Sequence, residues 1–149
     1  MKVLVTGAAG FIGNELCLRL SKEGHQVLGI DNLNDYYDVS LKKARLKRID
    51  KQSGFSFQQI DIADKSSLGK AYVEFQPEAT VNMAAQAGVR YSLKNPDVYI
   101  AANVTGFLNL LELCRHEGTN HLVYASSSSV YGANTLMPFS EHHSTEHPV

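Results

Sequence analysis

The sequence predicts an α/β fold, a doubly wound parallel sheet covered by helices on both faces. Two observations predict it: short apolar runs alternate with longer amphipathic stretches, and glycines cluster directly after the first apolar run. Strand–helix alternation is typical of parallel sheets, and right-handed crossovers then wind the sheet from its middle in both directions. A length of 149 residues with 44% hydrophobic residues suits one domain with an ordinary core.

The first part of the chain predicts three strands and two helices. Residues 3–5 are a short apolar run stopped by glycine, which predicts a buried strand. Over residues 11–23 apolar side chains recur every four positions among charged ones, which predicts an amphipathic helix that Gly24 ends. The next predicted elements are a strand over residues 26–30, a basic helix over 39–51 and a strand around 55–60.

The second part continues the alternation. Asp64 can cap a helix that runs to Gln76 and stops before Pro77. Residues 79–83 predict a fourth strand and residues 121–125 a fifth. Between these strands lies a long predicted helix over 96–117, with an apolar stripe formed by Val98, Ala102, Leu108, Leu111 and Leu113.

The last part of the chain, Ala133–Val149, shows no periodicity and is typical of a loop. A compact domain seldom ends on so long an unstructured tail. We therefore expect the sheet to be truncated after about the fifth strand, with residues 1–149 forming only the N-terminal part of a larger domain.

Composition excludes several classes of function. Fourteen basic and 15 acidic side chains give a formal net charge of -1, which argues against binding nucleic acid through bulk charge. No apolar run approaches the roughly 20 residues that a membrane span needs. Cys17 and Cys114 form neither a disulfide framework nor a Cys-x-x-Cys site, so a reducing cytoplasm is the expected location.

The glycine cluster, Thr6-Gly7-Ala8-Ala9-Gly10-Phe11-Ile12-Gly13, lies between the first strand and the first helix. Glycines there permit a tight turn, close approach of the backbone to a pyrophosphate, and close packing of helix on sheet. The helix N-terminus then presents free N–H groups to the phosphates. A glycine turn without a ligand is the alternative interpretation.

Asp31 strengthens the cofactor interpretation because it ends the second predicted strand. A carboxylate at that point accepts hydrogen bonds from ribose hydroxyls and repels a 2′-phosphate, which favours NAD over NADP. Asp61 follows the third strand, where it either caps the local turn or meets the adenine edge.

Three segments together carry a family resemblance: the glycine cluster, Asn82-Met83-Ala84-Ala85-Gln86, and Ser126-Ser127-Ser128-Ser129-Val130-Tyr131-Gly132. They resemble the extended short-chain dehydrogenase/reductase family, which implies a Rossmann fold that binds NAD. Within it the chain is similar to nucleotide-sugar epimerases, and to UDP-glucuronate 4-epimerases in particular. That narrower match lies in residues 31–38, in residues 85–92 and in Met137-Pro138-Phe139.

The resemblance implies epimerisation at C4 of a UDP-sugar, with UDP-glucuronate converted to UDP-galacturonate. In the family the C4 hydroxyl is oxidised by hydride transfer to bound NAD, and hydride returns to the other face of a transient 4-keto sugar. Ser127 matches the position of the hydroxyl that assists at the sugar oxygen. Ser128 and Ser129 stand where related dehydratases carry Asp-Glu, which favours epimerisation. Serine hydroxyls that bond only to backbone are the alternative.

The resemblance also implies particular contacts. Substrate contacts are expected from Arg90, Ser127 and Ser128, and a homodimer is expected. No metal is expected, because the spacing of His142, His143 and His147 fits no tetrahedral zinc site. The expected cofactor contacts are Gly7, Ala9, Gly10, Phe11, Ile12, Gly13, Asp31, Asn32, Asp61, Ile62, Ala84, Ala85, Gln86, Asn103, Ala125 and Ser126.

The departure from the family is the absence of its Tyr-x-x-x-Lys motif, whose tyrosine is the catalytic base. We therefore expect the chain as it stands to be an inactive fragment. The alternatives are a non-catalytic NAD-binding remnant and another epimerase or reductase of the same family.

Four features stay open at this point. Arg90 either grips the carboxylate of a uronic acid or is a salt-bridged surface residue. Asn103 either bends its helix near the catalytic group or faces solvent. The basic stretch 42–51 either attracts phosphate or is a solvated helix face, and the second interpretation is favoured. The tract Asp35-Tyr36-Tyr37-Asp38 lies either near the adenosine end or in a dimer contact.

Overall fold

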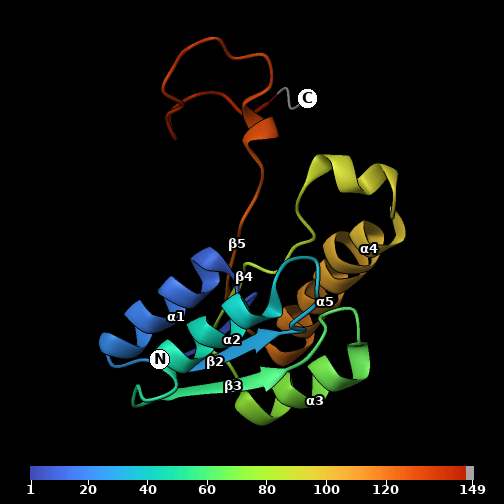
Figure 1. The fold of residues 1–149 in the computed structure, drawn as a ribbon. Coiled ribbons are helices and arrows are strands. Elements are labelled where there is room, and N and C mark those ends of the chain that lie inside the picture. The colour runs from blue at the N-terminus through green and yellow to red at the C-terminus, as the bar shows by residue number, and fades with distance from the viewer. Residues whose placement is uncertain (147–149) are drawn as a thin grey trace.

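A computed structural model describes residues 1–146 of the chain. Its sheet has five parallel strands in the order β3-β2-β1-β4-β5 (Figure 1). The chain thus starts in the middle of the sheet, winds out to one edge and crosses back to build the other, which confirms the doubly wound prediction. The strands are β1 (Lys2–Thr6), β2 (Gln26–Asp31), β3 (Phe55–Gln59), β4 (Ala79–Asn82) and β5 (His121–Tyr124).

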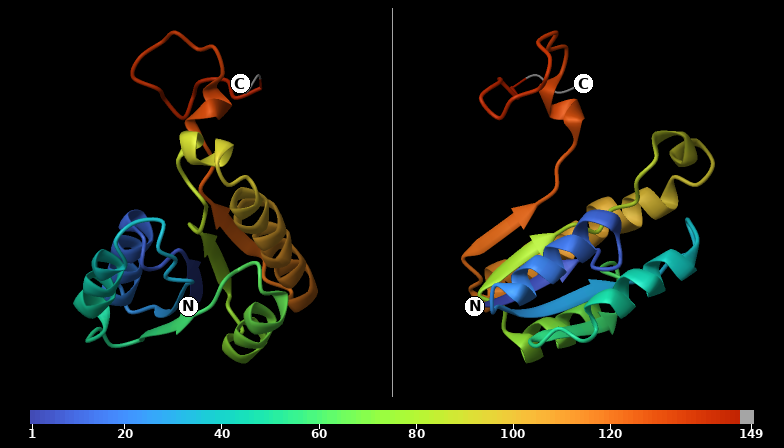
Figure 2. Two further views of the ribbon diagram at one scale, coloured as in Figure 1. Left: turned by 45° about the vertical axis from the view of Figure 1, so that its right-hand side comes forward. Right: turned by 60° about the vertical axis from the view of Figure 1, so that its left-hand side comes forward.

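Helices cover both faces of this sheet. One layer holds α1 and α2, and the opposite layer holds α3 and α5 (Figures 1 and 2). Each bound lies within about two residues of the sequence prediction, except at the long helix. The bounds are α1 (Phe11–Lys22), α2 (Val39–Ile49), α3 (Lys65–Phe75), α4 (Asp97–Tyr99) and α5 (Phe107–Glu117).

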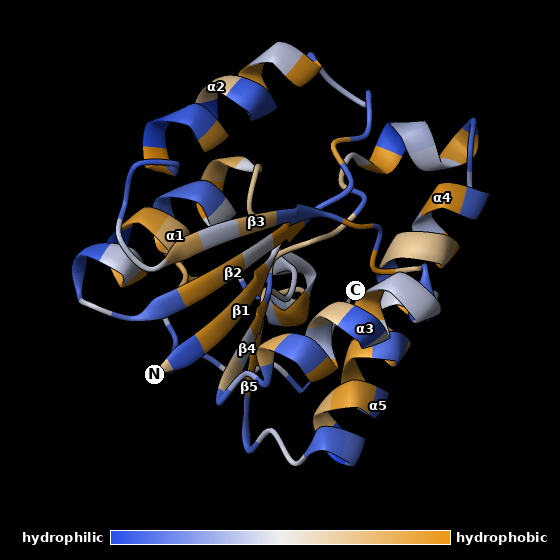
Figure 3. Cartoon of the chain, turned by 90° about the horizontal axis from the view of Figure 1, so that it is seen from below, coloured by the Kyte–Doolittle hydropathy of each residue, from blue (hydrophilic) through white to orange (hydrophobic). Residues whose placement is uncertain are grey.

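The core consists of two apolar clusters, one on each face of the sheet. Successive side chains of a strand point to opposite faces. Leu4 of β1 therefore packs with Leu68 of α3 and Leu110 of α5, whereas Val5 packs with Cys17 of α1. The central strands β1 and β2 are apolar on both faces and lie between the two helix layers (Figure 3). Full burial of each such side chain contributes about 1.5–3 kcal/mol.

The predicted helix limits have identifiable causes. The Asp64 side chain caps α3 by accepting from the backbone N–H groups of Ser66 and Ser67, each at 3.1 Å. Gly24 follows α1 with a φ of +86°, a conformation that glycine adopts without strain. Gln76 ends α3 in a left-handed conformation, directly before Pro77.

The long helix predicted over 96–117 is more complex than the sequence suggests. It begins with α4, continues as a π-helical segment over Ile100–Gly106 and becomes α5. Part of the predicted stripe is exposed, with Leu108 at 55% and Leu111 at 39%, whereas Leu110, which the stripe did not include, is fully buried. A π turn holds more residues than an α turn, so it shifts which residues of the following helix face the sheet.

Two segments lie outside the sheet and its helix layers. A 3-10 helix over Val89–Leu93, which the sequence did not predict, follows β4. After β5 a 3-10 turn over Ser128–Tyr131 leads into residues 132–146, which contain no helix or strand and project away from the sheet (Figures 1 and 2). His147 lies outside the described residues. Within residues 1–146, no helix is long and apolar enough to cross a bilayer.

Candidate functional site: a cleft at the carboxyl ends of the strands

A cleft of about 450 Å³ opens at the carboxyl ends of the parallel strands. Doubly wound sheets bind their ligands in this place. Its walls include most of the residues expected to contact the cofactor. These are Gly7, Gly10, Phe11, Asp31, Asn32, Asp61, Ile62, Ala84, Ala85 and Gln86.

The glycine turn needs its glycines for steric reasons. A Cβ on Gly7 would lie 2.7 Å from the carbonyl carbon of Met83 and 2.8 Å from the nitrogen of Ala84, and Gly7 has a φ of +67°. A Cβ on Gly10 would lie 3.0 Å from the oxygen of Gly7, and one on Gly13 would overlap that oxygen. This turn, here called the glycine cradle, therefore packs too closely against the segment after β4 and against itself to accept side chains at these positions. No side chain caps α1, so its first N–H groups remain available to an anion.

Asp31 is held in place from several sides. Its side chain is 8% exposed, and its Oδ2 accepts from the backbone nitrogen of Ala9 at 3.2 Å. Its Oδ1 accepts from the backbone nitrogen of Leu33 at 2.8 Å and lies 3.6 Å from Nζ of Lys42. A buried carboxylate is tolerated when its charge is paired and hydrogen-bonded in this way.

Two cations of α2 line the cleft, so the prediction of a solvated helix face is wrong for them. Lys42 is 4% exposed, donates to Oδ1 of Asn34 at 2.9 Å, and lies 5.0 Å from the centre of the Tyr37 ring. Arg45 donates to the hydroxyl of Tyr37 at 2.9 Å and lies over the Phe11 ring at 5.9 Å. The other basic residues of the stretch are exposed: Lys43, Lys47, Arg48 and Lys51.

A sequence signal for this arrangement existed. Lys42, Arg45 and Ile49 are spaced by three and four residues, so they share one face of α2, and Ile49 is fully buried. A cation on the buried face of a helix needs a partner, and Asp31 is that partner for Lys42.

The opposite wall is built from the segments after β3 and β4. Asp61 accepts from the amide of Asn32 at 2.9 Å through Oδ2 and from the backbone nitrogen of Ala63 at 2.9 Å through Oδ1. It therefore caps its local turn and also lines the cleft. Asn103 fixes the backbone of Gln86. Its side-chain oxygen accepts from the backbone nitrogen of Gln86 at 2.8 Å, and its side-chain nitrogen donates to the backbone oxygen of Gln86 at 3.0 Å.

Asn103 is exposed and does not line the cleft, but both ends of its amide are engaged. It lies in the π-helical segment, which is consistent with the prediction of a distorted helix at this position. Tyr36 and Tyr37 also line the cleft, whereas Asp35 and Asp38 of the same tract are outside its lining. The location of the tract near the adenosine end stays a prediction.

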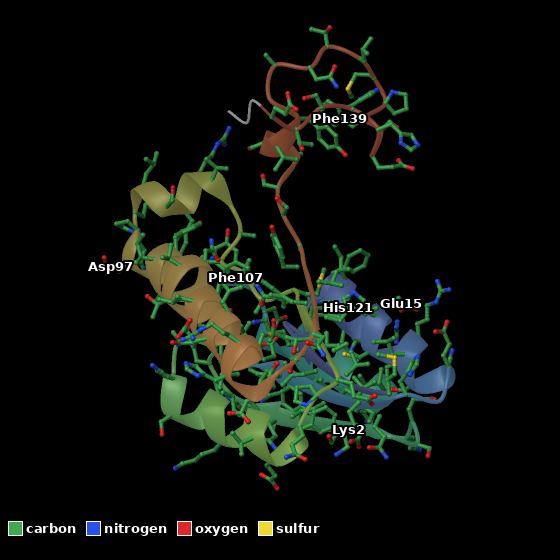
Figure 4. The ribbon with its side chains drawn as sticks, turned by 180° about the vertical axis from the view of Figure 1, so that it is seen from behind. Lys2, Glu15, Asp97, Phe107, His121 and Phe139 are labelled. Carbon is green, nitrogen blue, oxygen red and sulfur yellow. The ribbon has the colours of Figure 1, made fainter. Side chains whose placement is uncertain are left out.

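The remaining predicted residues lie apart from the cleft lining. Ala9 is buried behind the glycine turn, and Ile12 is 63% exposed. Ala125, Ser126 and Ser128 are exposed on the segment that leaves β5. Figure 4 shows how far that segment projects: Phe139 lies well away from the helix that carries Asp97 and Phe107.

The Ser127 hydroxyl bonds only within its own turn, and Arg90 has no charged partner among the described residues. The Ser127 hydroxyl accepts from the backbone nitrogen of Ser129 at 3.2 Å and so caps the 3-10 turn. Arg90 is exposed and forms no ion pair within residues 1–146. In the same residues, no group of three or more histidine, cysteine or acidic side chains is arranged to hold a metal.

Comparisons with known proteins agree with the fold. The chain is 54% identical over 149 residues to protein CapI of Staphylococcus aureus, and 50% identical over 149 residues to a UDP-glucuronate 4-epimerase of Arabidopsis thaliana. A crystal structure of UDP-glucuronic acid 4-epimerase from Bacillus cereus, in complex with UDP-glucuronic acid and NAD, superposes with a TM-score of 0.85 at 34% identity.

The matches span nearly all of this chain but less than half the length of each relative. The comparison covers 100% of this chain but 44% of CapI, and 99% of this chain but 32% of the Arabidopsis protein. It likewise covers 100% of this chain and 46% of the Bacillus cereus protein. Residues 3–149 match the NAD dependent epimerase/dehydratase family. The chain belongs to that family.

Proposed function

We propose that the chain binds NAD in the cleft and forms the cofactor-binding part of a nucleotide-sugar 4-epimerase. The observation that carries the proposal is Asp31, a buried carboxylate fixed at the end of β2 beside a glycine cradle. The cradle suits a pyrophosphate, because its three glycines keep the turn close-packed at the start of α1, where no side chain caps the helix and free N–H groups can bind an anion.

Within this proposal each wall of the cleft has a role. The N–H groups at the start of α1 bind the pyrophosphate, and Asp31 accepts hydrogen bonds from the adenosine ribose. Asn32 and Asp61 lie at the adenine edge, with Ile62 beneath it. Ala84, Ala85 and Gln86 form the opposite wall, and Asn103 holds Gln86 in position. NAD, when bound, supplies the acceptor and donor of hydride.

The proposed substrate is UDP-glucuronate, with UDP-galacturonate as product. Support comes from relatives named as UDP-glucuronate 4-epimerases and from the Bacillus cereus complex. Ser127 donates to and accepts from the C4 oxygen as it changes between hydroxyl and ketone. Ser128 lies beside the sugar, and Arg90 pairs with its carboxylate.

The proposed reaction also needs a base, and the proposal includes a reaction type and an oligomeric state. A base must take the C4 hydroxyl proton, and no Tyr-x-x-x-Lys motif occurs among the 149 residues. Hydroxyls at positions 128 and 129, in place of acids, support epimerisation without dehydration. We also propose a homodimer, supported by an exposed apolar stripe along one helix face: Ile100, Val104, Leu108 and Leu111.

The test is the affinity of the chain for NAD and NADP, measured by isothermal titration calorimetry. Asp31→Ala should weaken NAD binding about tenfold or more, because the ribose hydroxyls lose a charged acceptor. NADP binding should weaken less, because the same carboxylate repels a 2′-phosphate. Asp35→Ala, in the loop that follows β2, is the matched control and should leave both affinities unchanged.

One complication has a direct remedy. Asp31→Ala leaves Lys42 as a buried cation without its partner, which destabilises the fold. The double variant Asp31→Ala, Lys42→Met removes both charges, so it should regain thermal stability while NAD binding stays weak. Equal loss of NAD and NADP in the double variant would contradict the ribose role of Asp31.

A further inference from the structure

Two loops from opposite walls of the cleft meet at its rim. Tyr36 lies in the loop between β2 and α2, and Ala87 lies in the loop after β4; both line the cleft. The Tyr36 hydroxyl lies against Gly88 so closely that a Cβ on Gly88 would overlap it. Gly88 has a φ of +93°, which glycine alone adopts readily. The two walls are therefore in direct contact at this point.

Aromatic rings extend this contact into a cluster. The Tyr36 and Tyr91 rings lie 5.1 Å apart, tilted by 49°, and the Tyr91 and Tyr99 rings lie 6.4 Å apart, tilted by 46°. Both separations are in the range in which aromatic pairs attract each other. The cluster joins three separate segments: the loop after β2, the 3-10 helix over Val89–Leu93, and α4.

The far end of the cluster is anchored to the long helix. The Tyr99 hydroxyl donates to the backbone oxygen of Ala87 at 3.0 Å and also to that of Gly88. Desolvation and the nearby Tyr36 hydroxyl raise the pKa of Tyr99 above its ordinary value of 10.0. Asn103, four residues further along the same helix, fixes the adjoining Gln86. The loop after β4 is thus fastened to a rigid element on one side and to Tyr36 on the other.

We infer that Tyr36, Tyr91 and Tyr99 form a bridge across the rim of the cleft that must open before the cofactor can enter or leave. The inference rests on the proposed NAD site. In the proposed reaction hydride returns to the sugar, so the cofactor is regenerated in every turnover and exchange is not required. A bridge that slows exchange therefore leaves turnover unharmed and retains the cofactor.

The bridge and a simple binding contact make different kinetic predictions. Opening the bridge speeds entry and exit together, so the dissociation constant changes little. Loss of a direct contact with the cofactor raises the dissociation rate alone, and the dissociation constant rises by the same factor. The comparison of rate with affinity therefore separates the two roles.

The experiment measures release of radiolabelled NAD from the chain after a chase with unlabelled NAD, together with the dissociation constant from equilibrium dialysis. Tyr36→Ala removes one ring contact and the contact with Gly88, so we expect release about five- to tenfold faster with the dissociation constant changed less than twofold. Leu93→Ala is the matched control, because Leu93 lies on the same 3-10 helix, is 87% exposed and is outside the cluster. It should behave as the wild type.

A second pair of variants tests the bridge without Tyr36→Ala, so the test does not depend on whether that variant folds. Gly88→Ala places a Cβ against the Tyr36 hydroxyl and should also speed release. Adding Tyr36→Phe removes that hydroxyl, so the double variant should release NAD more slowly than Gly88→Ala alone. Thermal unfolding followed by circular dichroism checks each variant.

The outcomes separate the bridge from the cofactor site. Wild-type chain that binds no NAD overturns the proposed function and the bridge with it. Wild-type chain that binds NAD, with release unchanged in Tyr36→Ala and in Gly88→Ala, overturns the bridge alone. A dissociation constant that rises in parallel with the release rate makes Tyr36 a direct contact and also overturns the bridge.

Discussion

The cleft and the segment after β5 differ sharply in how far their own contacts define them. In the cleft, Asp31 accepts two backbone hydrogen bonds and pairs with a buried lysine. On the segment after β5, the Ser127 hydroxyl bonds only within its own turn. Strand β5 itself is open, with Val123 46% and Tyr124 55% exposed, whereas Leu4 and Val5 of β1 are fully buried.

This difference teaches that the two parts of the proposed site are separable. The groups assigned to the cofactor in the cleft are positioned by contacts among residues 1–110. The serines assigned to the sugar are placed on a strand end that these contacts do not reach. Substitutions of the serines should therefore leave the affinity for NAD unchanged. Substitutions in the cleft should change that affinity whether or not the serines are present.

The largest expected effect tests this separation directly. In a catalytically active form of the protein, Ser127→Ala should lower kcat about 100-fold, because a donor to a developing ketone oxygen is lost. The dissociation constant for NAD should stay within twofold of the wild-type value. Epimerisation of UDP-glucuronate, followed by chromatography of the sugar products, and calorimetric NAD titration provide the two measurements.

Two controls sharpen this prediction. Ser127→Thr keeps a hydroxyl and should retain more activity than Ser127→Ala. Ser129→Ala removes a neighbouring hydroxyl of the same turn, and its backbone nitrogen still donates to Ser127. A weakened affinity for NAD in Ser127→Ala would contradict the separation of the two parts.

An effect of intermediate size concerns the exposed helix face. Leu108→Glu should convert a dimer into a monomer, because a charge in an apolar interface loses hydration without gaining a partner. The free energy of unfolding of the single chain should change by no more than about 0.5 kcal/mol, since Leu108 is 55% exposed. Sedimentation velocity measures the assembly, and thermal unfolding measures the fold.

The matched control for this change is Val73→Glu. Val73 is 51% exposed on α3, outside the stripe, so the same substitution there should leave the assembly unchanged. A wild-type chain that sediments as a monomer at micromolar concentration would contradict the proposed dimer.

Sequence reasoning succeeded where the signal is local. The period of the apolar residues changes between strand and helix, and the glycines and Asp31 stand at fixed places in that alternation, so the fold and much of the cleft wall were predictable. The capping role of Asp64 followed from a single residue and its place before a helix.

The features that were missed depend on partners far away along the chain. The spacing of Lys42 from Ile49 marks its helix face, but its partner Asp31 lies 11 residues earlier and is brought beside it only by the fold. Gly88 and Tyr36 are in contact only because the parallel sheet brings their loops together. The full burial of Leu110, which the predicted stripe did not include, comes directly after a π-helical segment that no periodicity in the sequence marks.

The smallest expected effect is the pH dependence of stability that comes from Asp64, the cap of α3. Hydrogen bonds from the side chain and backbone of Ser67, with a further one from Ser66, hold the pKa of the Asp64 carboxyl below its ordinary value of 3.8. A carboxyl whose pKa is lower in the folded state stabilises the fold above its ordinary pKa. That contribution is lost as the pH falls below 3.8 towards the folded-state pKa.

Asp64→Asn keeps an acceptor at the cap of α3 but removes the charge. The melting temperature of the wild type should therefore exceed that of Asp64→Asn by a constant margin above pH 5, and this margin should shrink below pH 4. Glu74→Gln, an exposed change on the same helix, is the control, because Glu74 accepts no hydrogen bond within residues 1–146. A margin that stays constant down to pH 2.5 would show that the ionised form of Asp64 makes no particular contribution to the cap.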